Sequence, residues 1–291
     1  MGLRKTLISV KWSSSWASSE ATAWCIQLHA WVDGRLADTL SYSFASPTVF
    51  DYYHYMANSR NDDFNGETRK TAFLFDLDGT LVDSVYQHVL AWREALEAGG
   101  IRLAVWRIHR QIGMSGGLFV NALLRETGHT VSGDEAERLQ KLHGEAFSRY
   151  ASQVRPLPGA AELLSYLSKA GVPWAIATSG RLESASLSLR LLGISEDVPI
   201  ITRDLVKHAK PDPDLFLAAA EKLQVPIGDS VVVGDSIWDL LAARRARALG
   251  IGFLSGGYGR EELERAGAYR VYNDPADLLR HLDEVGVRRS E

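Results

Sequence analysis

Residues 72–80 read AFLFDLDGT, a short apolar run that ends in two acidic residues. The run is apolar without alternation, which is typical of a strand buried on both faces of a parallel sheet. Side chains two residues apart on a strand point the same way, so we expect Asp76 and Asp78 to share a face at its carboxyl end. Two such carboxylates repel each other unless a cation lies between them or one is protonated. Taken alone, the stretch is equally compatible with a strand that ends in an Asp-Gly turn.

Similar apolar runs recur along the chain and alternate with helical stretches. The runs are Trp174–Ala177, Val198–Ile201, Val231–Val233, Ile251–Leu254 and Tyr269–Tyr272. Helices are expected from Pro158-Gly159 to Gly171, from Pro213 through Lys222, and from Pro275 through Val285. This alternation predicts an α/β fold with a Rossmann-like, doubly wound parallel sheet and right-handed crossovers. Ligands of such sheets bind at the carboxyl ends of the strands.

One stretch breaks the alternation, between the first strand and the sequence Pro156-Leu157-Pro158-Gly159. It contains helical patterns only, at Ser84–Ala98, Gly117–Thr127 and Asp134–Tyr150. We therefore expect an α-helical cap over residues 88–155, inserted into an α/β core that comprises residues 71–87 and 156–291.

Three further strand ends carry polar residues. The second strand leads into Thr178-Ser179-Gly180, a later segment reads Lys210-Pro211-Asp212-Pro213, and the run at 231–233 leads to Asp235 and Asp239. Each has a simpler reading: a helix cap for Thr178, Ser179 or Asp235, and a solvated surface position for Lys210. Together they predict a cation site of Asp76, Asp78 and Asp235, with one fixed positive charge and a hydroxyl donor. Hard oxygen ligands without His or Cys favour Mg²⁺.

Four ordered motifs resemble the haloacid dehalogenase superfamily: Asp-Leu-Asp-Gly-Thr-Leu-Val-Asp-Ser at residues 76–84, Thr178, Lys210-Pro-Asp-Pro, and Gly234-Asp235-Ser236 with Asp239. The resemblance covers residues 71 to about 285 and is closest to the phosphoglycolate phosphatase and β-phosphoglucomutase-like branch with a helical cap. It implies a Mg²⁺-dependent phosphatase, a hydrolase that acts on a small phosphorylated metabolite. A sugar-phosphate mutase of the β-phosphoglucomutase type is the alternative within the branch. Carbon–halogen cleavage is disfavoured, because dehalogenases lack the second motif acid that Asp78 provides here.

The resemblance also implies a role for each matching residue. Asp76 is similar to the nucleophile that forms an aspartyl-phosphate, and Asp78 is similar to the general acid and base. Metal ligands would be Asp76, the backbone carbonyl of Asp78, and Asp235. Thr178 and Lys210 would hold the phosphoryl oxygens, and Ser179 and Gly180 beside Thr178 are further candidates for substrate binding. Asp239 would orient Lys210 or a metal-bound water rather than bind the metal directly.

Substrate choice is expected to lie in the cap. His88, early in the first cap helix, is a candidate substrate-binding residue. The equally weighted alternative is a histidine on the helix surface without a functional role. Ser115 and Gly116, in the loop Gly113–Gly117, could present backbone N–H groups to a substrate or simply connect two helices. Mutase relatives tend to carry an arginine in this loop, where this chain has glycine, and that difference weakens the mutase interpretation.

Composition limits the other functional classes. Lys and Arg number 32 and Asp and Glu number 36, a net charge of −4, whereas nucleic-acid or membrane-surface binding needs a basic surface. A single cysteine, Cys25, excludes an internal disulfide and a cysteine-based zinc site. No apolar run reaches the roughly 18 residues needed for a membrane span. We therefore expect a cytoplasmic protein, and no pattern in the chain indicates its oligomeric state.

The N-terminal region, residues 1–70, lies outside the motif pattern. Residues 1–55 hold four of the eight tryptophans and the only cysteine. Segments such as Ala23–Leu28 and Tyr42–Phe50 could be strands, and the polar stretch Ala57–Lys70 is typical of a linker. One hypothesis is that translation starts at Met56 and the preceding residues are not native. Another is that the tryptophan-rich segment docks a partner protein.

Overall fold

The computed structural model describes residues 6–17, 21–32, 35–44, 71–128, 132–195 and 197–287. The chain divides into two compact units, Met1–Thr68 and Arg69–Glu291. Met56 and the predicted linker Ala57–Lys70 lie outside the described residues. The translation start at Met56 and the linker therefore stay predictions.

The first unit contains a three-stranded antiparallel sheet in the order β1-β2-β3. Its strands are β1 (Thr6–Ala17), β2 (Ala21–Val32) and β3 (Arg35–Phe44). The expected strand at Ala23–Leu28 is confirmed within β2. The expected strand at Tyr42–Phe50 overlaps only the end of β3, and residues 45–50 lie outside the described residues.

The second unit is built on a six-stranded parallel sheet in the order β11-β10-β9-β4-β7-β8. Its strands are β4 (Ala72–Phe75), β7 (Trp174–Ala177), β8 (Ile200–Ile201), β9 (Ser230–Gly234), β10 (Leu249–Phe253) and β11 (Ala268–Tyr272). The first strand of the motif, β4, thus lies near the centre of the sheet, between β9 and β7. The predicted α/β fold with a parallel sheet is confirmed.

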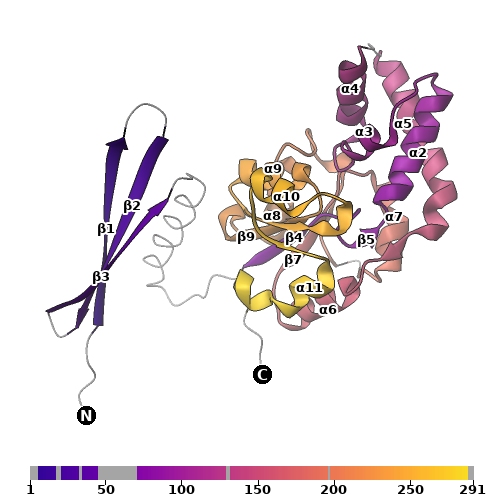
Figure 1. Cartoon of the computed structure of the whole chain (residues 1–291). Coiled ribbons are helices and arrows are strands. Elements are labelled where there is room, and N and C mark those ends of the chain that lie inside the picture. Colours follow the sequence, from indigo (N-terminus) through magenta and orange to yellow (C-terminus); the bar gives the residue numbers. More distant parts are fainter. Residues whose placement is uncertain are drawn as a thin grey trace. The chain divides into compact units, whose positions relative to one another are not determined.

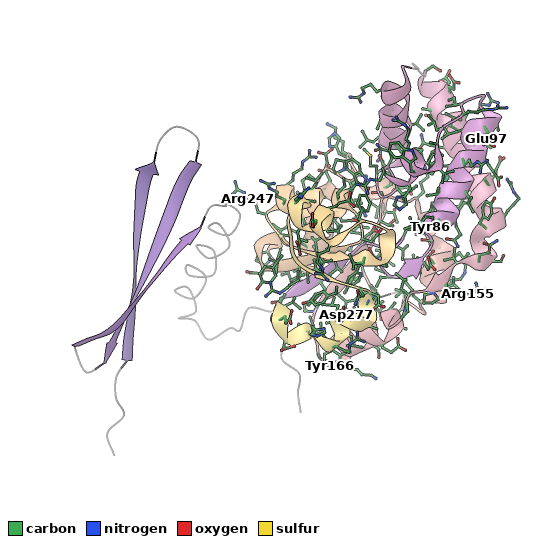
Figure 2. All side chains as sticks on the ribbon, viewed as in Figure 1. Tyr86, Glu97, Arg155, Tyr166, Arg247 and Asp277 are labelled. Atoms are coloured by element: carbon green, nitrogen blue, oxygen red, sulfur yellow. The ribbon has the colours of Figure 1, made fainter. Side chains whose placement is uncertain are left out.

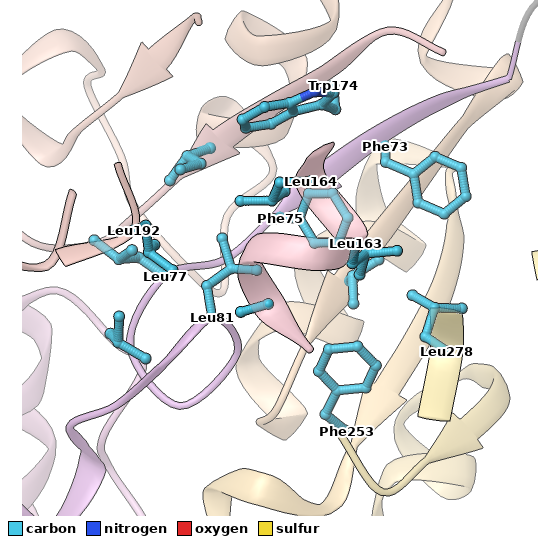
Figure 3. Packing of buried hydrophobic residues seen from close by; sticks show 14 of the residues in the cluster. Phe73, Phe75, Leu77, Leu81, Leu163, Leu164, Trp174, Leu192, Phe253 and Leu278 are labelled. Carbon is cyan, nitrogen blue, oxygen red and sulfur yellow. The ribbon is translucent and has the colours of Figure 1, made fainter. Parts of the chain in front are cut away.

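Helices cover both faces of this sheet, as Figure 1 shows for α6 and α11 on one face and α8 and α9 on the other. The helices are α6 (Ala160–Lys169), α7 (Leu182–Leu191), α8 (Asp214–Leu223), α9 (Ile237–Ala246), α10 (Arg260–Ala266) and α11 (Pro275–Arg280). Side chains of β4 alternate between the two layers. Phe73 and Phe75 pack with Leu163 of α6 (Figure 3). Leu74 packs with Phe216 of α8 on the other face. Burying each such side chain contributes about 1.5–3 kcal/mol, which holds β4 in place on both sides.

A helical insertion interrupts the core after β4. It consists of α2 (Val85–Ala98), α3 (Val105–His109), α4 (Gly116–Thr127) and α5 (Gly133–Tyr150). Three of these match the expected helices within one residue at each end, and the five-residue α3 was not predicted. The chain enters and leaves the insertion through two short antiparallel strands, β5 (Val82–Asp83) and β6 (Arg155–Pro156). The insertion has a core of its own, in which the rings of Trp92 and Phe119 lie 4.1 Å apart.

Among the residues that the structure describes, no helix is both long and apolar enough to cross a membrane.

Candidate active site

The register of the parallel sheet brings three of the motifs to one edge. Phe75 pairs with Ile176 of β7 and with Val233 of β9, so the residues that follow each strand meet beyond it. The Asp76 backbone N–H donates to the Val233 carbonyl oxygen at 2.9 Å, continuing the sheet by one residue. Asp76, Thr178 and Asp235 are therefore placed together by backbone pairing alone, and all three are buried.

A buried lysine ties this edge together. Lys210 is 0% exposed, and its Nζ donates hydrogen bonds to Asp76 Oδ1 and, at 2.8 Å, to Asp239 Oδ1. Burial alone would lower the pKa of Lys210, but the carboxylates of Asp239 and Asp76 outweigh that effect and raise it. Lys210 is therefore a fixed positive charge at the end of β4, as the sequence predicted, and it is not a solvated surface residue.

Asp239 is held by the start of its own helix. Its Oδ2 accepts hydrogen bonds from the Ser236 backbone N–H at 3.1 Å and from Ser236 Oγ at 2.5 Å, an arrangement that caps α9. A Cβ on Gly234 would lie 2.2 Å from Asp239 Cβ, so only glycine leaves room for this side chain. Both oxygens of Asp239 thus accept hydrogen bonds from protein donors, and its role of orienting Lys210 or a metal-bound water stays a prediction.

The site carries more negative charge than the protein balances. Oxygens of Asp76, Asp235 and Asp239 lie within 4.8 Å of one another, and Lys210 is the only cation hydrogen-bonded to them among the described residues. Burial raises the pKa of Asp235 well above its ordinary value, and the carboxylates of Asp239 and Asp76 add to the effect. Burial likewise raises the pKa of Asp76 to about 7, against the opposing charge of Lys210. A cation would favour the ionised form of both.

The geometry around Asp235 fits a hard divalent cation. Its Oδ1 accepts a hydrogen bond from Thr80 Oγ1 at 2.8 Å, and this is the only hydrogen bond to the carboxylate from the described residues. A Cβ on Gly256 would lie 1.8 Å from Asp235 Oδ2, so the backbone there approaches closely. Buried carboxylate oxygens without His or Cys are donors for Mg²⁺ and similar ions. These residues could therefore hold a divalent cation.

Asp78 lies two residues after Asp76 in a different environment. Its Oδ1 accepts a hydrogen bond from Ser84 Oγ at 2.7 Å and lies 3.3 Å from His88 Nε2. Burial would raise the pKa of Asp78, but His88 and Ser84 together outweigh it and lower the pKa. Since its carboxylate faces the start of α2, the predicted metal ligand at this position remains its backbone carbonyl. His88, a candidate from the sequence, is thus placed beside the predicted acid and base.

The loop after β7 offers hydrogen-bond donors. Thr178 Oγ1 accepts a hydrogen bond from the Gly180 backbone N–H at 3.0 Å, which leaves its own hydroxyl hydrogen free to donate. Ser179 Oγ is buried and has no hydrogen-bond partner in the described part of the chain. A buried hydroxyl without a partner costs about 1–3 kcal/mol, so a ligand that supplied an acceptor here would remove that cost.

Comparison with known proteins identifies the family. The family model of haloacid dehalogenase-like hydrolases matches residues 70–247, more than half of the chain. The chain belongs to the haloacid dehalogenase-like hydrolases. A crystal structure of a hydrolase from Pseudomonas syringae has 57% sequence identity to this hydrolase and a TM-score of 0.74, covering 75% of this chain and 100% of that one.

Two curated relatives indicate which branch of the family this chain resembles. Hexitol phosphatase A from Escherichia coli is 35% identical over 171 residues, which cover 58% of this chain and 76% of the relative. β-Phosphoglucomutase from Bacillus subtilis is 30% identical over 217 residues, which cover 72% of this chain and 92% of the relative. The predicted resemblance to this capped branch of the family is confirmed.

One backbone carbonyl of the helical insertion of this hydrolase accepts two hydrogen bonds from the core. The Arg110 carbonyl oxygen accepts hydrogen bonds from Trp238 Nε1 at 3.2 Å and from Tyr258 OH at 2.8 Å. The Arg110 guanidinium forms an ion pair with Glu262 and lies over the Tyr258 ring. Next to it, His109 Nε2 lies 2.8 Å from the Gly256 carbonyl oxygen.

These contacts hold one side of the insertion against the α9 and α10 side of the core. Helix α2 runs from Tyr86, near this contact, to Glu97 at the far end of the insertion (Figure 2).

The two cap-loop candidates of the hydrolase, Ser115 and Gly116, lie at the start of α4. Ser115 is 3% exposed, and a Cβ on Gly116 would lie 3.1 Å from the Gln140 side chain of α5. Gly113 approaches the core instead, because a Cβ there would lie 2.7 Å from Ser236 Oγ. Substrate contact by Ser115 and Gly116 stays a prediction.

Sequence reasoning missed several residues of this site. Thr80 and Ser84 stand within the first motif, and the Ser84 hydroxyl, six residues after Asp78, could have been recognised as a local donor to it. The Thr80 hydroxyl donates to Asp235 instead. His143 and Trp238 carry no such signal, because helix packing brings them to the site from distant parts of the chain.

Proposed function

We propose that this hydrolase is a Mg²⁺-dependent phosphatase that hydrolyses a small phosphorylated metabolite through an aspartyl-phosphate on Asp76. The observation that carries the proposal is the buried Asp76 carboxylate at the end of the central strand, hydrogen-bonded to Lys210 and grouped with Asp235 and Asp239. Phosphoryl transfer requires positioning and charge neutralisation, and this edge of the sheet offers both. Relatives named as phosphatases of small phosphorylated compounds support the substrate class.

In the first step an Asp76 carboxylate oxygen attacks the phosphorus, and the bond from phosphorus to the leaving oxygen breaks. Asp78 donates a proton to that oxygen, and the alcohol leaves. The ordinary state of Asp78 is ionised, because His88 and Ser84 lower its pKa. An arriving phosphate carries like charge, which favours the protonated form of Asp78 and prepares it as the acid.

In the second step a water molecule attacks the phosphorus and Asp78 takes a proton from it. The bond between phosphorus and the Asp76 oxygen breaks and inorganic phosphate leaves, so that Asp76 is again a carboxylate and Asp78 is again protonated, as it was immediately before the first step. Lys210 and Thr178 would hold the phosphoryl oxygens, and Ser179 and Gly180 lie beside them. Mg²⁺, held by Asp76, Asp235 and the Asp78 carbonyl, would neutralise phosphoryl charge when bound.

The test is turnover of p-nitrophenyl phosphate by Asp76→Asn. We expect the rate to fall by about 10⁴-fold or more, since the nucleophile is lost while the shape of the side chain is kept. Asp83→Asn is the matched control, because Asp83 is an exposed carboxylate in the same segment, and it should retain wild-type activity. Appreciable turnover by Asp76→Asn, or full wild-type activity in excess EDTA, would refute the mechanism.

A sugar-phosphate mutase is the second candidate, favoured by the 30% identity to β-phosphoglucomutase over most of that protein. A mutase must protect its phosphoenzyme from water and needs a bisphosphate activator, whereas a phosphatase hydrolyses the phosphoenzyme quickly. Rapid release of inorganic phosphate without any activator supports the phosphatase. A long-lived phosphoenzyme that transfers its phosphoryl group to a sugar phosphate would support the mutase.

A further inference from the structure

Two histidines of the insertion lie in a chain that ends on Asp78. His88 of α2 and His143 of α5 approach each other with 3.1 Å between His88 Nδ1 and His143 Nε2. The opposite nitrogen of His88, Nε2, lies 3.3 Å from Asp78 Oδ1. His143 does not touch Asp78 in any contact of the described structure, so it reaches the predicted acid and base only through His88.

Aromatic packing fixes the planes of both rings. The His88 ring stacks on Phe147 at 3.9 Å with an interplanar angle of 2°, and the His143 ring stacks on Trp92 at 4.3 Å. Phe147 lies on α5 and Trp92 on α2, so each histidine is held by the helix that carries the other. Packing therefore sets the ring positions but leaves open which nitrogen of each ring carries hydrogen.

Hydrogen bonding decides that question. Burial lowers the pKa of His143 well below its ordinary value, so His143 is neutral at neutral pH. His88 Nε2 must carry hydrogen, because a bare nitrogen would repel the facing carboxylate of Asp78. In the neutral form of His88 its Nδ1 is then an acceptor, and the hydrogen between the two rings belongs to His143 Nε2. In that form the chain runs from His143 to His88 to Asp78.

We propose that His143 is a positioning residue that fixes the tautomer of His88 and, through it, the orientation of the Asp78 carboxylate. The proposal rests on the proposed role of Asp78 as general acid and base. With Oδ1 held by Ser84 and His88, Asp78 keeps Oδ2 for the proton transfers. Without the His143 donor, His88 has no preference for the Nε2–H form, and the other form turns a lone pair toward Asp78.

The kinetic test compares His143→Phe with His143→Gln on two substrates of similar size. Phenylalanine keeps an aromatic ring on α5 that can stack on Trp92, but it removes the N–H donor to His88. Glutamine instead places an amide N–H close to the position of His143 Nε2. Benzyl phosphate has a basic alkoxide leaving group that needs the acid, whereas p-nitrophenolate leaves without a proton. For His143→Phe we expect kcat/KM to fall about tenfold or more on benzyl phosphate. On p-nitrophenyl phosphate kcat/KM should stay within about threefold of wild type.

His143→Gln should restore most of the benzyl phosphate activity. Equal losses on the two substrates in His143→Phe would overturn the proposal, because a merely structural defect lowers both. An unchanged benzyl phosphate rate in His143→Phe would overturn it as well.

A second measurement does not depend on activity. In ¹⁵N-labelled protein, side-chain nitrogen shifts distinguish a protonated from a bare imidazole nitrogen, and His88→Gln identifies the His88 signals. The proposal requires the Nε2–H form of His88 in the wild type and a mixture of forms in His143→Phe. An Nδ1–H form of His88 in the wild type would overturn it. If the wild type hydrolyses neither phosphate, the proposed function fails, and these shifts still decide the role of His143.

Discussion

Asp76 and Asp78 stand two residues apart at the end of one strand, yet they belong to different halves of the site. The core half surrounds Asp76 with the carboxylates of Asp235 and Asp239 and one lysine. Burial raises the pKa of Asp76 to about 7 against the charge of Lys210, and the carboxylate of Asp239 adds to the rise. The insertion half surrounds Asp78 with donors, and the pKa of Asp78 falls. Burial raises the pKa of both carboxyl groups, so burial alone does not explain why one shift is upward and the other downward.

The difference shows how one fold can give two identical side chains different chemistry. Excess negative charge around Asp76 attracts a divalent cation, which would then reduce the repulsion between the site and an anionic phosphoryl group. Donors around Asp78 hold a carboxylate that must give and take protons without binding the phosphorus. The core half therefore holds the reacting group, and the insertion half controls the proton.

The largest expected effect distinguishes Asp76 from Asp78 by the reaction step in which each one acts. With p-nitrophenyl phosphate, Asp78→Asn should still transfer the phosphoryl group, because the leaving group needs no proton, but hydrolysis of the phosphoenzyme should slow by about 10²–10⁴-fold. Asp76→Asn should form no phosphoenzyme at all. Rapid-quench labelling with ³²P measures both. If neither variant accumulates labelled protein, the division of roles between the two aspartates is wrong.

A second, smaller effect concerns pH and the core half alone. Because the pKa of Asp76 is raised from 3.8 to about 7 and that of Asp235 is also raised, the metal-free folded state binds more protons than the unfolded state in this range. Stability of the metal-free protein should therefore fall as the pH rises from about 4 to 7. Added Mg²⁺ should raise the melting temperature more at pH 8 than at pH 5. Equal shifts at the two pH values would contradict the charge argument.

The smallest effect concerns the contact between insertion and core. Glu262→Gln removes the partly exposed ion pair with Arg110, which is worth about 0–1 kcal/mol, so the melting temperature should hardly change. Trp238→Phe removes a donor to the Arg110 carbonyl and should cost about 0.5–1.5 kcal/mol. Thermal unfolding of both variants measures which of them loses more stability. A larger loss for Glu262→Gln than for Trp238→Phe would show that the side chain of Arg110, and not its carbonyl, holds the insertion.

Much of the core half could be predicted from the sequence. Apolar runs without alternation identified β4, β7 and β9, and parallel strands end at one edge, so Asp76, Thr178 and Asp235 had to meet there. The three long helices of the insertion were equally readable from their spacing and caps, as Ser132 shows by accepting a hydrogen bond from the Glu135 backbone N–H. These features depend on local periodicity, which the chain carries in its order of residues.

The contacts of the insertion half could not be predicted from the sequence, because they depend on tertiary structure. His143 reaches His88 only because α5 packs along α2, and the Arg110 carbonyl meets Trp238 only because the insertion contacts α9. Neither contact leaves a spacing that a sequence pattern can reveal, since each joins residues more than fifty positions apart. The sequence by itself determined which acids gather at the sheet edge. The opposite pKa shifts of Asp76 and Asp78 arise from the side chains packed around them, and only the tertiary structure decides which side chains those are.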